Sequence, residues 1–399
     1  MKTVLPSDLH QLLGGLTPSQ FLRGWWHKKP LLIRNAIPGF KPLISKAQLF
    51  SLAKQDEVES RIVVRTSPPG RRSGNLWQLH HGPLVARDFR RDTGEKWSLL
   101  VQGVNLHIPA ADALLRRFNF VPYSRIDDLM ISYANQGGGV GPHFDSYDVF
   151  LLQAHGTRRW RISMQTDRTL VDGAPLKILK HFKHTAEYLL VPGDMLYLPP
   201  GCAHDGVATD ADDCMTYSIG FRAPSAEELA RGLLEHAAET LVRQGFYADP
   251  GLKPAARAAL LDDAYVNQAA RLIGNVHPPR ALLETYLGQM LTEPKANVFF
   301  DAPDAPLSAA AFARAAMRRG VKLDLRTQML YRGQTLFING ETAGAPLSPT
   351  LERLADARQL PAGTASATRG SARPDARLSA KAMQALYLWY THGWLHLSD

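Results

Sequence analysis

The chain has 399 residues, of which 45% are hydrophobic and 21% are charged, a composition typical of a folded protein with two or three domains. It excludes collagen-like, coiled-coil and disordered classes, and no apolar run reaches the roughly 18 residues of a membrane span, so we expect a cytoplasmic protein without membrane contact. The net charge is +9, and the only two cysteines, Cys202 and Cys214, are too few for a thiolate zinc site, so any metal has to be held by histidine and carboxylate.

Most of the excess positive charge lies before residue 225, and the segment 61–96 is its densest part. Its basic residues are Arg61, Arg65, Arg71, Arg72, Arg87, Arg90, Arg91 and Lys96. Such a patch is typical either of a solvated basic face or of a surface near RNA. No aromatic or glycine pattern of an RNA-binding module accompanies it, which favours the solvated face.

Six short β-rich runs between residues 97 and 221 are separated by Gly, Pro, Asn and Asp. They are WSLLVQGV (97–104), LMISYA (129–134), DVFLLQA (148–154), TRRWRIS (157–163), YLLVPGDMLYLP (188–199) and CMTYSIGF (214–221). Strands at this spacing predict a β-sandwich or a β-barrel.

Three residues among these runs form a pattern of metal ligands. His143 and Asp145 are two residues apart, so on an extended strand both side chains leave the same face. His204 follows a strand that runs into a Pro-Pro-Gly turn and supplies a third ligand. Two imidazoles and one carboxylate on one face of an octahedron leave three positions open, as in non-haem Fe(II) oxygenases. We therefore predict that His143, Asp145 and His204 bind a catalytic Fe(II).

The three open positions suit a bidentate 2-oxo acid together with O₂, and the protein must then bind the far carboxylate of that acid. In the strand 157–163, a period of two places Arg158 with Trp160 on the apolar face. A guanidinium can hold a carboxylate through two parallel hydrogen bonds, and Ser132 can add a hydroxyl from a neighbouring strand. Two alternatives remain: Arg158 pairs with a core carboxylate such as Asp194, and Ser132 is only a core hydroxyl.

The pattern becomes helical after residue 224. Ser225 and Glu228 form a capping-box pattern, and apolar residues follow at helical spacing up to Gly245. Two further helical pieces are ARAALLDDAY (256–265) and RALLETYLGQML (280–291). Their Leu- and Tyr-rich faces can pack on each other or on a second subunit.

The last hundred residues predict a winged-helix arrangement, because helical segments flank two strands joined around Arg332 and Gly333. The segments are helices at 307–320, 351–360 and 382–397, and strands at 321–333 and 334–340. The small and polar segment 361–376 is predicted to be a loop.

Several motifs together resemble the JmjC-type 2-oxoglutarate and Fe(II) dependent oxygenases, and among them the bacterial ribosomal oxygenases. The opening FLRGWWHKKPL (21–31) is similar to the W-x-K-P-L element of that family. Three further segments follow its bacterial members closely: GGGVGPHFDSY (137–147), LYLPPGCAH (196–204) and YSIGFRAP (217–224). The resemblance covers most of the chain.

The resemblance implies an α+β chain with three parts. The first is a JmjC catalytic domain over 1–224, whose double-stranded β-helix (the cupin fold) spans about 97–222. A helical dimerisation region over 225–295 and a winged-helix domain over 296–399 follow. It also implies His143, Asp145 and His204 as the iron ligands, and Arg158 and Ser132 as the 2-oxoglutarate-binding residues.

The activity implied is hydroxylation of an arginine in a large-subunit ribosomal protein of the L-sixteen type, with Fe(II), 2-oxoglutarate and O₂, releasing succinate and CO₂. The partners implied are that ribosomal protein, a second copy of the chain and, weakly, ribosomal RNA. Two alternatives are a JmjC histidine hydroxylase or lysine demethylase, and a non-catalytic binding protein. A cationic substrate needs local negative charge, and five carboxylates lie near the metal ligands in sequence: Asp148, Asp205, Asp210, Asp212 and Asp213.

Overall fold

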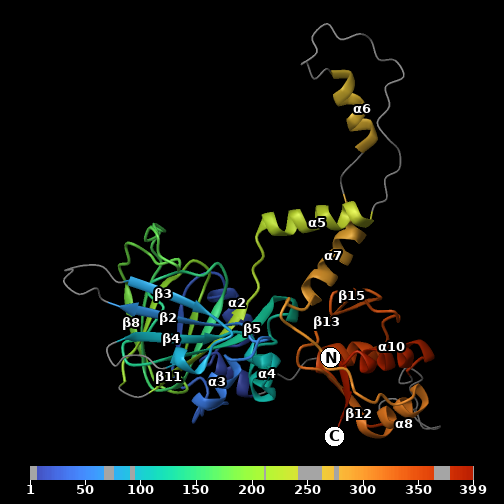
Figure 1. The fold of residues 1–399 in the computed structure, drawn as a ribbon, viewed down its shortest axis with the longest axis horizontal. Coiled ribbons are helices and arrows are strands. Elements are labelled where there is room, and N and C mark those ends of the chain that lie inside the picture. The colour runs from blue at the N-terminus through green and yellow to red at the C-terminus, as the bar shows by residue number, and fades with distance from the viewer. Residues whose placement is uncertain are drawn as a thin grey trace.

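The computed structural model describes residues 7–66, 76–89, 95–210, 213–240, 263–273, 278–363 and 378–398. Figure 1 shows a β-rich body formed by the chain up to β11, a smaller C-terminal body, and the helices α5 to α7 between and above them. Within the described part of the chain, no helix is both long and apolar enough to span a membrane.

Two antiparallel sheets make up the β-rich body. The larger has eight strands in the order β1-β9-β6-β11-β5-β4-β2-β3, and the smaller has the order β10-β7-β8. The strands are β1 (Leu31–Ile33), β2 (Ser60–Thr66), β3 (Leu76–His81), β4 (Lys96–Val101), β5 (Ile126–Ala134), β6 (Val149–His155), β7 (Arg158–Ser163), β8 (Ala186–Leu190), β9 (Met195–Leu198), β10 (Ala203–Ala208) and β11 (Cys214–Phe221). This arrangement confirms the predicted cupin-type fold, and β1, β2 and β3 extend its larger sheet with strands from before residue 97.

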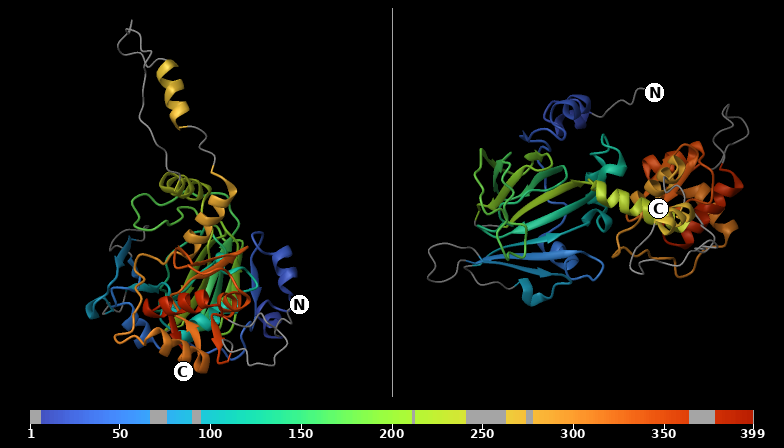
Figure 2. Two further views of the ribbon diagram at one scale, coloured as in Figure 1. Left: turned by 90° about the vertical axis from the view of Figure 1, so that its right-hand side faces the viewer. Right: turned by 90° about the horizontal axis from the view of Figure 1, so that it is seen from above.

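Strand pleating gives the larger sheet two different faces. On β5, Leu129 and Ile131 are fully buried in the main hydrophobic core, whereas Asp128, Met130 and Ser132 alternate with them and line a cavity. The core-facing side is covered by α1 (Ser7–Leu12), α2 (Pro18–Gly24), α3 (Lys46–Leu52) and α4 (Pro109–Arg116). Figure 2 shows the first of these helices, in dark blue, against one side of the sheets. The other side is left to the smaller sheet and the site.

The helical region begins at the predicted capping box. The Ser225 backbone N–H donates to the Glu228 carboxylate at 2.6 Å, and the Glu228 N–H donates to Ser225 Oγ at 3.1 Å. The helices are α5 (Ala226–Thr240), α6 (Asp263–Ile273) and α7 (Arg280–Thr292). α5 contacts α7 and stands away from the β-rich body, whereas α7 packs on β13 (Met329–Arg332) and β14 (Thr335–Ile338) of the C-terminal body (Figure 1). The predicted continuation of α5 to Gly245, and residues 256–262 of the next predicted helix, lie outside the described residues.

The C-terminal body has a hydrophobic core of its own, with Phe312, Leu351 and Leu386 fully buried. Its elements are α8 (Ala309–Arg319), β12 (Gly320–Leu323), β13 (Met329–Arg332), β14 (Thr335–Ile338), β15 (Glu341–Thr342), α9 (Pro349–Ala357), β16 (Gln359–Pro361), α10 (Ala380–Thr391) and β17 (Leu395–Leu397). They form two small sheets, β16-β12-β17 and β13-β14-β15, between helices. This is the predicted winged-helix arrangement.

Three details of this body differ from the prediction. The single strand expected over 321–333 is two strands in different sheets, because a turn at Asp324 to Thr327 separates β12 from β13. The helices expected over 351–360 and 382–397 each end early and are followed by the short strands β16 and β17. The predicted hairpin at Arg332 and Gly333 is present, and residues 364–376 of the predicted loop lie outside the described residues.

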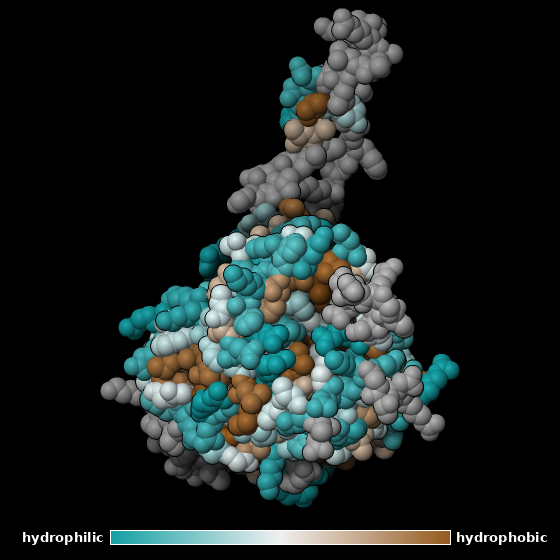
Figure 3. All heavy atoms as spheres, turned by 90° about the vertical axis from the view of Figure 1, so that its left-hand side faces the viewer, coloured by the Kyte–Doolittle hydropathy of each residue, from teal (hydrophilic) through white to brown (hydrophobic). Residues whose placement is uncertain are grey.

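The surface seen from the side of β3 and β8 is mixed. Figure 3 shows hydrophobic side chains exposed in separate patches among hydrophilic ones on this face. Exposed apolar residues in and after β8 include Leu189 and Val191, which are 49% and 44% exposed. Scattered apolar exposure of this kind is common on protein surfaces.

Candidate metal centre

Backbone pairing brings the two predicted histidine ligands together. His143 and His204 form an antiparallel bridge, in which each backbone N–H donates to the carbonyl of the other at 3.0 and 2.7 Å. Their ring centroids are 4.2 Å apart, and Asp145 Oδ2 lies 3.7 Å from His204 Nε2. One ligand atom from each of the three side chains lies within 4.8 Å of the others. This spacing fits a metal ion held by two imidazoles and a carboxylate.

Backbone carbonyls orient both imidazoles. His143 Nδ1 donates to the Gly141 carbonyl at 2.8 Å, and His204 Nδ1 donates to the Cys202 carbonyl at 2.9 Å. Each Nε2 therefore keeps its lone pair for a metal. Burial, together with repulsion from His143, lowers the pKa of His204 to about 4. The ring is thus neutral at pH 7, which is the form that binds metal.

The glycine run before His143 lets the loop pack against both sheets. A Cβ on Gly139 would lie 2.4 Å from the carbonyl oxygen of Gly206 on β10, and one on Gly138 would lie 2.2 Å from that of Trp97. Contacts this short exclude any side chain without backbone movement. Since β10 also carries His204, the small residues set the distance between the two histidine ligands.

Arg158 is the predicted carboxylate-binding residue, and its guanidinium has atoms without partners. It is 4% exposed, and its Nε and Nη2 atoms have no hydrogen-bond partner within the described structure. A buried cation without partners is costly, so the arrangement fits an anionic ligand. The alternative partner, Asp194, is instead engaged by Arg34 at 2.5 Å and by the backbone N–H of Asn35.

Arg158, Ser132 and the metal triad line the same cavity of about 410 Å³ between the two sheets. The Ser132 hydroxyl is buried and donates to the Thr216 carbonyl at 3.3 Å. Its oxygen can still accept a hydrogen bond, and its hydrogen can rotate to donate to a ligand instead. Other cavity residues come from alternate positions of their strands: Ser98, Leu100, Val149, Leu151, Trp160, Thr216 and Ser218. The triad and both predicted 2-oxoglutarate residues therefore face one space.

Of the acidic residues expected from sequence proximity, the four that the structure describes do not line this cavity. Asp148 is buried beside Tyr197 and His27, Asp213 pairs with Lys46, and Asp210 accepts a hydrogen bond from Thr157. Asp205 is not among the lining residues of the cavity, and Asp212 lies outside the described residues.

Two carboxylates that the sequence analysis missed do line it, Asp127 and Asp128. Burial, the nearby Asp127 and Glu59 raise the pKa of Asp128 to about 6, although Lys295 and a hydrogen bond from the Gly103 N–H act in the opposite direction. Asp128 could have been found from its position, because Asp128, Met130 and Ser132 share one face of a strand at period two.

The predicted basic patch is described only in part. Arg61 lines the catalytic cavity, and Arg65 lies over the Trp77 ring and donates to the Gly137 carbonyl at 3.4 Å. Four of its other basic residues lie outside the described residues: Arg71, Arg72, Arg90 and Arg91. Arg61 and Arg65 are therefore engaged with the β-rich body.

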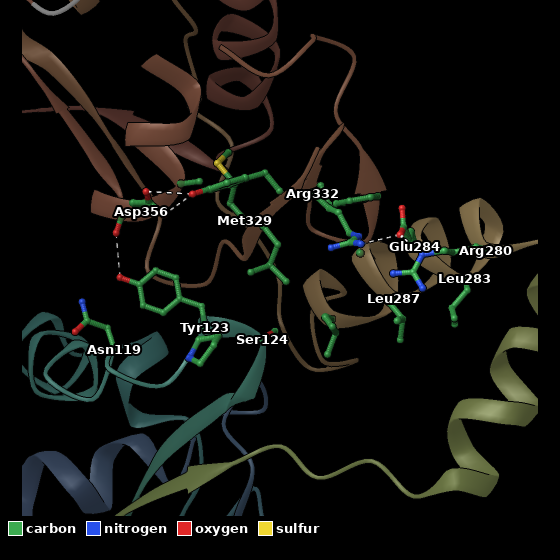
Figure 4. A pocket seen from close by; sticks show the side chains of 17 residues that line it. Asn119, Tyr123, Ser124, Arg280, Leu283, Glu284, Leu287, Met329, Arg332 and Asp356 are labelled. Atoms are coloured by element: carbon green, nitrogen blue, oxygen red, sulfur yellow. Dashed lines mark hydrogen bonds and ion pairs between the residues drawn. The ribbon is translucent and has the colours of Figure 1, made fainter. Parts of the chain in front are cut away.

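A larger cavity of about 740 Å³ lies between the two bodies and α7. Figure 4 shows Tyr123 and Asp356 on one side of it and Glu284 with Arg332 on the other. The Tyr123 hydroxyl donates to the Asp356 carbonyl at 3.0 Å, and Arg332 pairs with Glu284 at 2.8 Å. The cluster of possible metal ligands found in the described chain is the His143 site, so the smaller cavity is the one equipped for chemistry.

Comparison with known proteins gives consistent matches along the chain. A JmjC domain model matches residues 113–229, and a ROXA-like winged helix model matches residues 264–396. The ribosomal protein uL16 3-hydroxylase of Escherichia coli is 34% identical over 338 residues, which cover 84% of this chain and 87% of that protein. A "Probable ribosomal oxygenase" of Haemophilus influenzae is 38% identical over 222 residues, covering 55% and 52%.

More distant relatives and solved structures agree with these matches. The bifunctional lysine-specific demethylase and histidyl-hydroxylase NO66 of Drosophila pseudoobscura is 26% identical over half of this chain and 21% of that protein. A crystal structure of YcfD from E. coli superposes with a TM-score of 0.78 at 30% identity, covering 96% of this chain and 98% of YcfD. Another structure of YcfD, in complex with cobalt and 2-oxoglutarate, gives 0.76 at 29% identity, covering 96% and 99%.

Proposed function

Because the chain belongs to the JmjC-domain ribosomal oxygenases, we propose that it hydroxylates an arginine side chain of a large-subunit ribosomal protein of the uL16 type. The enzyme is a dioxygenase that uses Fe(II), 2-oxoglutarate and O₂. The E. coli relative carries uL16 3-hydroxylase in its name, and we infer a cytoplasmic location for this chain from the proposed ribosomal substrate.

We assign metal binding to His143, Asp145 and His204, and binding of the far carboxylate of 2-oxoglutarate to Arg158 with Ser132. The bound iron with its co-substrate supplies the oxidising power to hydroxylate an unactivated C–H bond, with release of succinate and CO₂. The protein's own part is to orient the ligands through Gly141 and Cys202 and to hold the reacting carbon near the metal.

The observation that supports an arginine substrate is the carboxylate pair of Asp127 and Asp128. Both lie in the cavity of the metal triad, with Met130 on the same strand between Asp128 and Ser132. A guanidinium can form two parallel hydrogen bonds to a carboxylate, and a methionine can pack against an aliphatic stem. A neutral histidine side chain has no need of two carboxylates, so the site favours a cation over the histidine-hydroxylase alternative.

The test is hydroxylation of ribosomal protein fragments. Anaerobically prepared enzyme receives Fe(II), 2-oxoglutarate, air and fragments of large-subunit proteins, and the peptides are sequenced by tandem mass spectrometry. We expect a gain of one oxygen on an arginine, absent with His143→Ala and strongly reduced with Asp128→Asn. Oxygen on a histidine, or loss of a methyl group from a lysine, would select one of the other JmjC activities. Absence of both succinate and product, with iron bound, would favour a non-catalytic binding protein.

We also propose a homodimer formed through the helical region. Leu234 on α5 and Val266 on α6 are 49% and 48% exposed, and α5 stands away from the β-rich body. Unpaired apolar helix faces of this kind favour self-association. Light scattering after size exclusion should give the mass of two chains, and Leu234→Glu should shift it towards one chain.

The basic residues Arg61 and Arg65 are compatible with ribosomal RNA nearby. Filter binding of RNA at low and high salt would test this.

A further inference from the structure

A lysine from outside the β-helix lies on the carboxylate pair of the catalytic cavity. Lys295 belongs to the connection between α7 and α8, and its Nζ lies 3.3 Å from Oδ1 of Asp127 and 4.0 Å from Oδ2 of Asp128. It lines the same cavity as the metal triad. A cation of the protein itself therefore lies where the proposed function requires the guanidinium of the substrate.

We propose that Lys295 is a positioning residue that competes with the substrate arginine for Asp127 and Asp128 and leaves them when the substrate binds. This inference rests on the proposed function, because competition requires a cationic substrate side chain. Two cations placed within a few ångströms of each other repel, and the repulsion is strongest where water is partly excluded. Binding of the guanidinium at the carboxylates therefore requires the ammonium to move.

The lysine side chain can move while its backbone stays in place. The Lys295 carbonyl accepts a hydrogen bond from the Val298 N–H at 2.9 Å, and the Asn297 side-chain amide donates to the Glu57 carbonyl at 2.7 Å. These contacts fix the connection to the β-rich body. The Lys295 side chain itself is 44% exposed and has a flexible four-carbon stem, so its ammonium can reach a more solvated position. A half-exposed ion pair of this kind contributes little to stability.

In the free enzyme the lysine prepares the site for a cation. Burial raises the pKa of Asp128, and Asp127 and Glu59 raise it further, whereas Lys295 lowers it. Lys295 thus favours the ionised carboxylate until the substrate arrives. Arg222 lies 3.7 Å from Asp127 Oδ1 and remains as a second counter-charge at the outer carboxylate. The more buried Asp128 is then the group released for the substrate.

The competition also sorts substrates. An arginine can displace the lysine because two parallel hydrogen bonds to one carboxylate hold it more tightly than a single ammonium. A substrate lysine would exchange one ammonium for another and gain little. Lys295 is accordingly expected to weaken the binding of every cationic side chain. Arginine should remain the side chain with the highest affinity for the carboxylates.

The test compares the binding of a labelled arginine-containing uL16-type fragment to wild type and Lys295→Met by fluorescence anisotropy, without oxygen. If the lysine occupies the site in about 80 to 90% of free molecules, its removal tightens binding by roughly five- to tenfold. KM for the fragment should fall by a similar factor while kcat stays the same. Lys177→Met is the matched control, because Lys177 lines the same cavity but forms no ion pair with Asp127 or Asp128 in the described structure, and Lys295→Arg should retain weak binding.

Unchanged or weaker binding by Lys295→Met, with an unchanged melting temperature, would overturn the inference and make Lys295 a structural or substrate-assisting residue. An equal gain in Lys177→Met would also overturn it, because the effect would then come from net charge alone. If the wild type neither binds the fragment nor adds oxygen to its arginine, the proposed function itself fails. The mass spectrometry on wild type distinguishes that outcome from a failure of the inference.

Discussion

Arg158 places a guanidinium in the cavity wall with two nitrogen atoms that have no partner in the described structure. A buried charge of this kind destabilises the free protein and binds an incoming carboxylate strongly, because the cost of burying the charge has been met in folding. Arg159 is the next residue of β7 and is not among the lining residues of the cavity, which makes it a matched control.

Replacement of Arg158 by methionine should therefore separate stability from co-substrate binding. Charge-assisted hydrogen bonds contribute about 1.5–3 kcal/mol, so KM for 2-oxoglutarate should rise roughly 10- to 150-fold. Without 2-oxoglutarate, the variant should melt at or above the wild-type temperature. We also expect 2-oxoglutarate to stop stabilising it in a thermal-shift assay. A variant with normal KM would show that another residue holds the carboxylate, and Arg159→Met should leave KM unchanged.

At the residue scale, the sequence was sufficient to predict the metal-binding group, because metal coordination restricts the spacing of the ligands along the chain. The spacing of His143 and Asp145 and the turn before His204 predicted the group that the structure brings within 4.8 Å. The acidic residues were different, because proximity in sequence to a ligand does not determine which face of a strand a side chain occupies. Asp127 and Asp128 reach the cavity through the pairing of β5 with β4 and β11, which depends on residues far apart in the chain.

The loop that precedes His143 packs against both sheets, and its small residues are geometrically required. A Cβ on Gly139 would meet the Gly206 carbonyl at 2.4 Å, which cannot be relieved by a side-chain rotation. Relief requires movement of the loop away from β10, and that movement separates His143 from His204. Local packing and the metal centre are thus coupled through one glycine.

Gly139→Ala is expected to weaken the metal centre more than the fold. Overpacking costs about 1–3 kcal/mol, so the variant should remain folded with a lower melting temperature. Since the two imidazoles separate, Mn(II) affinity measured by calorimetry should fall at least about tenfold, in line with 1.4 kcal/mol per factor of ten. Gly24→Ala in α2 is the control, because a Cβ there has nothing within 4 Å. Equal metal affinity in both variants would contradict the coupling.

At the element scale, periodicity identified most catalytic strands but failed where a distant contact breaks a strand. The run 321–333 alternates like one strand, yet Asp324 ends β12 by pairing with Arg326 and with His396 from β17. Similarly, the sequence analysis assigned the β2 segment to a basic patch because of its arginines. Ile62, Val63 and Val64 are nevertheless fully buried, and β2 is part of the larger sheet. Contacts with strands from elsewhere in the chain decided both cases.

The whole molecule contains two large hydrophobic cores that share no residue, one in the β-rich body and one in the winged-helix body. Polar contacts join them, among them the Tyr123 hydroxyl on the Asp356 carbonyl and, through α7, which packs on the winged-helix body, Arg222 on the Leu291 carbonyl at 2.6 Å. Separate cores with a polar junction favour separate unfolding transitions. Metal and 2-oxoglutarate bind only the first body and should stabilise only its transition.

Asp324→Asn tests this independence, because Asp324 organises the winged-helix body alone. Its carboxylate pairs with Arg326 at 2.7 Å and His396 at 2.9 Å, and its side chain is only 10% exposed. Removal of one partner from a largely buried pair costs about 3 kcal/mol, which in a domain of this size lowers the melting temperature by about 10 °C or more. In calorimetry at pH 7, we expect one transition to move and the 2-oxoglutarate-stabilised one to remain.

The same variant gives a pH dependence of known sign. Burial acts to raise the pKa of Asp324, but hydrogen bonds from His396 and Arg326 outweigh it and hold the pKa well below its usual range. The stabilisation is therefore fully present above the unfolded carboxyl pKa of about 3.9 and declines as pH falls below it. The difference in melting temperature between wild type and Asp324→Asn should stay the same from pH 7 down to about pH 4 and shrink at lower pH. A single transition that moves as a whole in the variant would instead show that the two bodies unfold together.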